Sequence, residues 1–267
     1  MSIAQGKAAE NMKAVAKKTT GQVATFDAEK FADQGFEKLS QKDLALPFLK
    51  ILGALSPQVT ENDAKFIPEA RPGMIYNSVT DQLYSGQKGI IVVPCFYKLE
   101  YIEWQDRDKG SGAPANIYES DSDIMQKTTR DDQNKDRLEN GNYVEETASH
   151  YVLIVEGGEP KETALITMRS TQRKKSKKWN SMMVSIREPK KSGKGFYKPA
   201  PFTQMYNLKS VSEKNALGSW YGWDIDYAGL VPNQLVMDSA YSFYQSCSGG
   251  KMNVKHEKED QTPKTAW

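Results

Sequence analysis

The chain has 267 residues, 38% of them hydrophobic, and a formal net charge of +2, so it can bury a sizeable core but is more polar than a typical globular protein. It has no run of about 18 apolar residues, and its N-terminus lacks the apolar stretch of a secretory signal, so we expect neither a membrane span nor secretion. Cys95 and Cys247 lack metal or redox spacing, which favours the reducing cytoplasm.

The two ends of the chain differ in composition from the region between them. Residues 1–30 are rich in Ala, Lys, Thr and Gln and have no sustained apolar face, which predicts a flexible N-terminal tail. Residues 247–267 are polar and predict a flexible C-terminal tail. We therefore expect a single domain over residues 31–246, with LALPFLKILGAL (44–55) anchoring the first tail to it.

Strand signals follow from residue 74 onward. MIYNSVT (74–80) and QLY (82–84) predict a hairpin that turns at Thr80 and Asp81. GIIVVPCFYKLEYIEW (89–104) is β-branched and aromatic and gives the strongest strand signal, with Pro94 indicating a bulge or a sheet edge.

Residues 105–142 are rich in Asp, Ser, Gly, Asn and Lys and predict a long acidic loop insertion that is partly disordered. Its aspartates, Asp121, Asp123, Asp131 and Asp132, could bind a divalent metal. Because no apolar scaffold would hold them rigidly, a solvated acidic loop is the favoured interpretation, and we expect no metal site.

The second half of the chain alternates strands and helices. HYVLIVEGG (150–158) and TALITM (163–168) predict a hairpin, and Ser170 could cap a helix that runs to about Ile186. The apolar face of that helix would contain Trp179, Met182, Met183 and Ile186. The remaining predicted elements are a flexible basic loop (190–201), two strands (202–215 and 219–231) and a last helix (234–245).

The segment from Arg169 to Lys198 is the most informative part of the sequence. It holds eleven Lys or Arg residues against one acid, Glu188, a local net charge of +10, with Trp179, Phe196 and Tyr197 interleaved. Cations neutralise phosphates and release counterions, and aromatic rings stack on unpaired bases. The segment therefore indicates single-strand binding, and the alternative is a solvated basic helix with one buried tryptophan.

Two other groups of aromatic residues could also stack on bases. In the run 220–223 (WYGW), strand alternation places Trp220 and Trp223 on opposite faces, so one of them could present a ring beside Gly222. Tyr97 and Tyr101 share one face of the strong strand signal and could form a paired stacking platform. The alternative is that both faces of these strands are covered.

Four patches carry a resemblance to a known family: LALPFLKILGALSPQV, EARPGMIYNSVT with GIIVVPCFYKLEYIEW, MRSTQRKKSKKWNSMM, and GSWYGWDI. They extend from about residue 44 to residue 225 and resemble tailed-phage single-stranded DNA-binding proteins. The resemblance implies an oligonucleotide/oligosaccharide-binding (OB) barrel, no catalysis, and coating of single strands during phage replication or recombination. Carried over, Arg173, Lys174, Lys175, Lys177, Lys178 and Trp179 belong to the basic motif, and Trp220 and Trp223 to the aromatic one.

The C-terminal tail departs from the pattern of such proteins. It ends in an aromatic residue, Trp267, as tails that recruit replication or recombination proteins often do, but Lys258 and Lys264 dilute its acids. Recruitment of those phage proteins through the tail is one expected partnership. The sequence also leaves open a homodimer.

We therefore predict a mainly β (α+β) protein with an elaborated five-stranded OB-like barrel and two or three helices, although the strand count alone would equally allow a sandwich. The predicted function is non-enzymatic single-stranded DNA binding in the host cytoplasm, without cofactor or metal. The alternatives are a phage structural or assembly protein whose basic segment docks an acidic protein, and a metal-dependent nuclease. The predicted DNA-binding residues are Tyr97, Tyr101, Arg169, Arg173, Lys174, Lys175, Lys177, Lys178, Trp179, Lys190, Lys191, Lys194, Phe196, Tyr197, Lys198, Trp220 and Trp223.

Overall fold

The structure is a computed structural model that describes residues 28–32, 34–39, 43–106, 112–216, 218–250, 254 and 256. The chain divides into two units, Met1–Ser40 and Gln41–Trp267, and all the described strands belong to the second. In the first unit a 3-10 turn, η1, spans Ala28–Phe31. Most of the predicted N-terminal tail and most of the predicted C-terminal tail lie outside the described residues.

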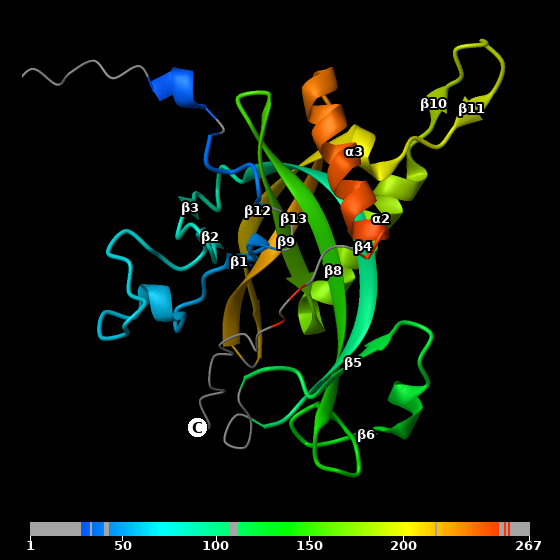
Figure 1. Cartoon of the computed structure of the whole chain (residues 1–267). Coiled ribbons are helices and arrows are strands. Elements are labelled where there is room, and N and C mark those ends of the chain that lie inside the picture. The colour runs from blue at the N-terminus through cyan, green and yellow to red at the C-terminus, as the bar shows by residue number, and fades with distance from the viewer. Residues whose placement is uncertain are drawn as a thin grey trace, which may run out of the picture. The chain divides into compact units, whose positions relative to one another are not determined.

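The second unit is built on a large antiparallel sheet that curls into a half-barrel (Figure 1). Its five long strands pair in the order β13-β12-β4-β8-β9. Three strands consecutive in the sheet are followed by a fourth that returns beside the first, which is a Greek key. The protein is therefore mainly β, as predicted. The bounds are β4 (Ile90–Trp104), β8 (Tyr143–Glu156), β9 (Glu159–Met168), β12 (Gln204–Asn215) and β13 (Gly218–Leu230).

The strand signals of the sequence are confirmed at β4, β8 and β9. The register of β4 on β8 shifts between Pro94 and Phe96, because a proline cannot donate a ladder hydrogen bond and is accommodated at a bulge. A turn at Gly157 and Gly158 joins β8 to β9, and both residues have positive φ, which glycine adopts without a steric penalty. The hairpin of β12 and β13 is also confirmed.

The concave face of the curled sheet holds the main core. Val92, Val152, Ile166 and Leu208 are buried there together with Trp223. Helix α2 (Arg173–Ser185) follows the 3-10 turn η5 (Ser170–Gln172) and contributes Trp179 and Met183 to the same cluster. The order of elements is thus three strands, a helix and two strands around one core.

A small sheet lies where the two edges of the curled sheet approach each other. It comprises β1 (Leu49–Ile51), β2 (Ile75–Asn77) and β3 (Leu83–Tyr84), in that order, and the predicted hairpin around Thr80 and Asp81 is confirmed as β2 and β3. Phe48 forms a parallel bridge with Leu165 of β9, and β1 also contacts β13. We call this junction of β1, β9 and β13 the seam. The loop after β1 includes the 3-10 turn η3 (Pro57–Val59).

Helix α3 (Gln234–Ser248) covers the convex face of the sheet (Figure 1). Val236, Ala240 and Phe243 pack on a second apolar cluster that contains Val93 and Leu153. The helix is capped by Asn233, whose side chain accepts a hydrogen bond from the backbone N–H of Val236. It begins where the sequence predicts and continues three residues further. Both cysteines are buried and free, and burial raises the pKa of the Cys247 thiol to about 12.

The predicted loop insertion contains three short strands and a 3-10 turn. Glu103 of β4 organises them: its carboxylate accepts hydrogen bonds from Asn116, Tyr118, Asn140 and Asn142. Burial alone would raise the pKa of Glu103, but these donors stabilise its charged form and lower the pKa to about 2. The elements are β5 (Asn116–Glu119), η4 (Ile124–Lys127), β6 (Thr129–Arg130) and β7 (Asp136–Arg137).

The predicted flexible basic loop also contains regular structure. A short hairpin, β10 (Glu188–Pro189) and β11 (Phe196–Tyr197), is followed by the 3-10 turn η6 (Pro201–Thr203). None of the helices in the described part of the chain has the length and apolar character needed to cross a membrane.

Candidate nucleic-acid interface

Helix α2 separates the basic segment into a buried face and an exposed face. Arg173, Ser176, Trp179 and Met183 are buried, at a spacing of three or four residues, as expected for one stripe of a helix. The predicted cap at Ser170 is wrong, because the 3-10 turn η5 precedes the helix and Ser170 lies in that turn with a φ of 48°. The helix starts at Arg173 without a side-chain cap.

Trp179 belongs to the core and is removed from the predicted interface. Its indole stacks on the ring of His150 at 4.5 Å between centroids and meets Tyr206 edge-on at 5.7 Å. The side chain is fully buried, so no base can stack on it. Trp179 therefore anchors α2 to the core. This matches the alternative interpretation of a basic helix with one buried tryptophan.

A buried polar group lies next to this ring stack. Ser176 Oγ lies 2.8 Å from His150 Nε2 and accepts a hydrogen bond from Arg173. Burial, and then the nearby charge of Arg173, lower the pKa of His150 to about 3, so the imidazole is neutral at physiological pH. Nε2 of the neutral ring can accept a hydrogen bond from the Ser176 hydroxyl, which connects the helix to β8.

Three of the predicted phosphate-binding cations are engaged with carboxylates. Arg169 pairs with Glu145 at 3.0 Å, Arg173 with Glu146 at 3.0 Å, and Lys175 with Glu213 at 2.7 Å. Arg173 is also buried, so it cannot contact a phosphate in this conformation. These residues fix α2 to β8 and β12, and we remove Arg173 from the interface.

The other lysines of α2 face outward. Lys174, Lys177 and Lys178 are exposed, and within the described residues none of them forms a salt bridge. We call these three residues the basic helix face. They lie on the side of α2 opposite Trp179, so the same helix buries its ring and presents its cations.

The hairpin of β10 and β11 is exposed from Pro189 to Lys198, and Glu188 at its start is half-buried. Phe196 and Tyr197 are 69% and 48% exposed, high values for aromatic side chains. Figure 1 shows the hairpin extending outward beyond α2. We call residues 188–198 the basic hairpin. Its exposed cations, which form no salt bridge within the described part of the chain, are Lys190, Lys191, Lys194 and Lys198.

The predicted rings on β4 and β13 are mostly covered. Tyr97 packs against the inner core and tilts on His150, with 5.0 Å between centroids, and Tyr101 is half-buried. Trp223 is only 3% exposed, so it is removed from the interface. Trp220 is half-buried, and its Nε1–H donates to Glu213 at 2.9 Å. These four rings do not join the basic hairpin in one surface patch.

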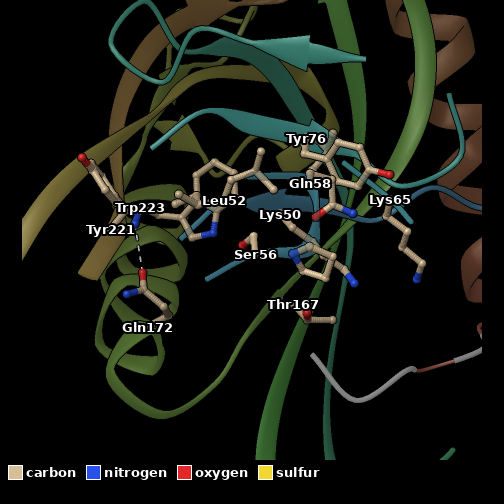
Figure 2. A pocket seen from close by; sticks show the side chains of 13 residues that line it. Lys50, Leu52, Ser56, Gln58, Lys65, Tyr76, Thr167, Gln172, Tyr221 and Trp223 are labelled. Atoms are coloured by element: carbon tan, nitrogen blue, oxygen red, sulfur yellow. Dashed lines mark hydrogen bonds between the residues drawn. The ribbon is translucent and has the colours of Figure 1, made fainter. Parts of the chain in front are cut away.

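The exposed ring of this aromatic run is Tyr221, which the sequence did not single out. It lines a pocket of about 290 Å³ at the seam, together with Lys50, Gln58, Lys65, Thr167 and Gln172 (Figure 2). We call this the seam pocket. Its lysines precede Tyr221 by more than half the chain, so no local pattern could have connected them.

Two of the four candidate metal-binding aspartates have protein partners. Asp131 accepts from Arg137 at 2.6 Å, and Asp123 pairs with Lys127 at 3.0 Å. Across the part of the chain that the structure describes, no group of three or more His, Cys, Asp or Glu residues is arranged to hold a metal ion.

Comparison with known proteins gives one match. A family model for Pam3 phage gp34-like proteins matches residues 16–253. No curated protein and no solved structure matches the chain. The matched family is one of phage proteins, so the bacteriophage origin that the resemblance implies is confirmed, while single-strand binding stays a prediction. Because the match extends over most of its length, the chain belongs to the Pam3 phage gp34-like protein family.

Proposed function

We propose that this phage protein binds single-stranded DNA without catalysis and coats it during phage replication or recombination in the host cytoplasm. The observation that carries the proposal is the combination of the basic helix face and the basic hairpin. Seven lysines there are exposed without a salt-bridge partner among the described residues, and the hairpin adds Phe196 and Tyr197 as exposed rings. Phosphate neutralisation and base stacking need these two groups close together.

The strand order supports an OB-like barrel as the scaffold. An OB-fold is a five-stranded, partly open Greek-key barrel that binds oligonucleotides. Here the sheet order β13-β12-β4-β8-β9 contains a Greek key. In chain order, α2 follows β9, the third long strand, and precedes β12, the fourth. The seam between β9 and β13, occupied by β1, corresponds to the open side of such a barrel.

Charge sets the expected form of the binding. Each phosphate neutralised on a single strand contributes about −0.7 to the slope of log K against log salt. If all seven exposed lysines contact phosphates, the slope is about −5. Each stacked base adds about 1–3 kcal/mol with little dependence on sequence. Binding should therefore be steeply salt-dependent and tolerant of sequence.

The test is fluorescence anisotropy of an end-labelled oligo-dT of about 30 nucleotides, a length above the site size of a single OB-fold. The label belongs on the DNA because Trp104, Trp179 and Trp223 are buried and need not respond to a bound base. We expect saturable binding that weakens steeply with salt, and no binding at any salt concentration would overturn the proposal. The same mixture with Mg²⁺ should leave the strand intact, whereas cleavage lost on Asp121→Ala would favour the nuclease alternative.

The second candidate is a phage structural or assembly protein. The observation that favours it is the outward extension of the basic hairpin, on which the adjacent apolar rings of Phe196 and Tyr197 are both exposed. In that case the lysines dock an acidic protein surface. A stoichiometric protein complex, together with no anisotropy change on oligo-dT, would select this candidate.

A further inference from the structure

The seam pocket is a hollow formed by parts of the chain that lie far apart in sequence. β1, the loop that follows it, β2, the end of β9, η5 and β13 all contribute to its lining. It adjoins a second hollow of about 400 Å³, which shares Lys50, Gln58, Lys65 and Tyr76 with it. Together the two fall in the size range of small-molecule sites.

The charge in the seam pocket has one sign. Lys50 and Lys65 line it, and no carboxylate does. Neither lysine forms a salt bridge among the described residues, and the Lys50 ammonium lies 5.6 Å from the centroid of the Phe48 ring. Asp81 lines only the adjoining hollow, where it accepts a hydrogen bond from Tyr76 at 2.5 Å. Two ammonium groups in a partly shielded hollow attract an anion strongly.

The opposite end of the pocket is bounded by Tyr221, whose ring is held in place by Gly73. A Cβ at residue 73 would lie 2.6 Å from Cε1 of the tyrosine ring, closer than real contacts allow. Beside the ring, Gln172 Oε1 accepts a hydrogen bond from the backbone N–H of Trp223 at 2.9 Å. Figure 2 shows Tyr221 and Gln172 at one end of the pocket and Lys65 at the other.

The pocket adjoins the candidate DNA surface through the start of α2. Gln172 lines the pocket and is the residue that immediately precedes α2, and Lys174 of the basic helix face lies two positions further on. A strand held by the lysines of α2 therefore passes close to the pocket. A single nucleotide turned out of that strand has both the charge and the ring that the pocket can accept.

We propose that the seam pocket binds one nucleotide, with its phosphate between Lys50 and Lys65 and its sugar and base toward Tyr221. This inference rests on the proposed function, because the nucleotide belongs to the bound single strand. A free nucleotide has the same chemistry, so the experiment includes both sources. The pocket gives the protein a second contact to DNA that does not depend on the basic hairpin.

Trp223 provides a readout inside the pocket, because it lines the pocket and is otherwise buried. The protein is labelled with 5-fluorotryptophan, and the ¹⁹F resonance of Trp223 is assigned with the Trp223→Phe variant. The probes are the oligo-dT strand, dTMP and inorganic phosphate. We expect the oligomer and dTMP to shift the Trp223 resonance, while that of Trp104, which is buried in a separate cluster, stays in place.

Two pairs of variants isolate the site. Lys50→Gln with Lys65→Gln should weaken dTMP binding roughly 10-fold or more, since two charge-assisted contacts are lost, and should make the salt slope for oligo-dT shallower by about 0.7, because the two lysines share one phosphate. Lys127→Gln with Lys209→Gln is the charge control, because it removes the same two charges from lysines that lie in salt bridges with Asp123 and Asp226. Gly73→Ala should displace Tyr221 and weaken dTMP binding.

The control for Gly73→Ala is Gly141→Ala. The two glycines have nearly equal φ values, 86° and 84°, so the backbone strain is matched, but nothing lies within 4 Å of the added Cβ at residue 141. Equal dTMP affinity in the two variants, both shown to be folded, would contradict the role of Tyr221.

The outcomes separate the pocket from the function on which it rests. If oligo-dT binds but neither oligo-dT nor dTMP moves the Trp223 resonance, and the Lys50 and Lys65 double variant has the same dTMP affinity and salt slope as the Lys127 and Lys209 double variant, the inference is overturned and the proposed function stands. If dTMP moves the resonance but oligo-dT shows no binding, the pocket is a free-nucleotide site and strand binding is overturned.

Discussion

Both halves of the basic segment combine cations with aromatic rings, but their surroundings are opposite. In α2, Arg173 and Trp179 are buried against β8 and the core, and Lys175 is held by Glu213. In the basic hairpin, the cations and both aromatic rings are exposed. A run of lysines with interleaved rings therefore performs two physical tasks here. The first half stabilises the fold, and the second half, together with the outer lysines of α2, is available to a partner.

The largest expected effect separates the two aromatic sites. Trp179→Ala should lower the free energy of unfolding by about 3–5 kcal/mol, because it leaves a cavity among His150, Tyr206 and Met183. Phe196→Ala should change it by less than about 0.5 kcal/mol, since the ring is mostly in water. Urea denaturation followed by circular dichroism measures both, and equal destabilisation would contradict the division of the segment.

The second effect concerns pH and the buried half. The pKa of His150 is about 3 in the folded protein against an ordinary value of 6.5, so on acidification the unfolded chain takes up the proton first. Stability should therefore fall as the pH drops from 6.5 toward 3, by at most about 1.4 kcal/mol per pH unit. Between pH 6.5 and 5 the carboxylate of Glu103, with its low pKa, contributes little.

Urea titrations at several pH values measure this slope. His150→Gln cannot titrate, so its stability should depend less on pH in the same window. If that variant does not fold, the ring resonances of His150 in the wild type provide the measurement, and a titration near pH 6.5 would show that the ring is accessible to protons.

The third effect concerns the exposed rings. Phe196→Ala and Tyr197→Ala should each weaken oligo-dT binding by about 1–3 kcal/mol if the ring stacks on a base. The control is Tyr241→Ala, which removes a ring of α3 that is 46% exposed and does not belong to the basic hairpin. Anisotropy titration compares the three variants, and an unchanged affinity in both hairpin variants would limit the hairpin to electrostatic contact.

The smallest effect is the salt dependence of the hairpin lysines. Replacing Lys190, Lys191 and Lys194 with Gln should make the salt slope shallower by about 2, at 0.7 for each phosphate contact. A control with the same loss of charge replaces Lys98, Lys127 and Lys209, which all lie in salt bridges. Equal slopes for the two triple variants would show that only the net charge matters.

Prediction from the sequence was most reliable where adjacent residues alone determined the local structure. β-branched runs and glycine turns predicted β4, the β8–β9 hairpin and the β12–β13 hairpin, because a strand and its turn are specified by adjacent residues. Apolar spacing also located α2 and α3. The short strands of the acidic insertion were not predicted, because Glu103, whose carboxylate accepts hydrogen bonds from Asn116 and Asn142, precedes the insertion in the chain.

The candidate site was only partly predictable. Lysines of the basic hairpin and the helix face are exposed, as a charge run usually is. Arg173 and Trp179 of α2 face inward because they contact Glu146 and His150. Those two partners lie on β8, which the sequence of the helix does not reveal. The seam pocket needs Lys50, Lys65 and Tyr221 together, and only the folded chain brings them to one place.

The position of β1 at the seam has a consequence for how the chain folds. Phe48 is synthesised long before Leu165, the residue with which it pairs, so the strand that seals the half-barrel must wait for β9. Long-range pairing of this kind closes slowly because it carries a large loop-closure cost. Pulse-labelled hydrogen exchange should therefore find the Leu165 amide, which donates to Pro47, protected later than its neighbours in β9. The first strand to leave the ribosome would then be the last to dock.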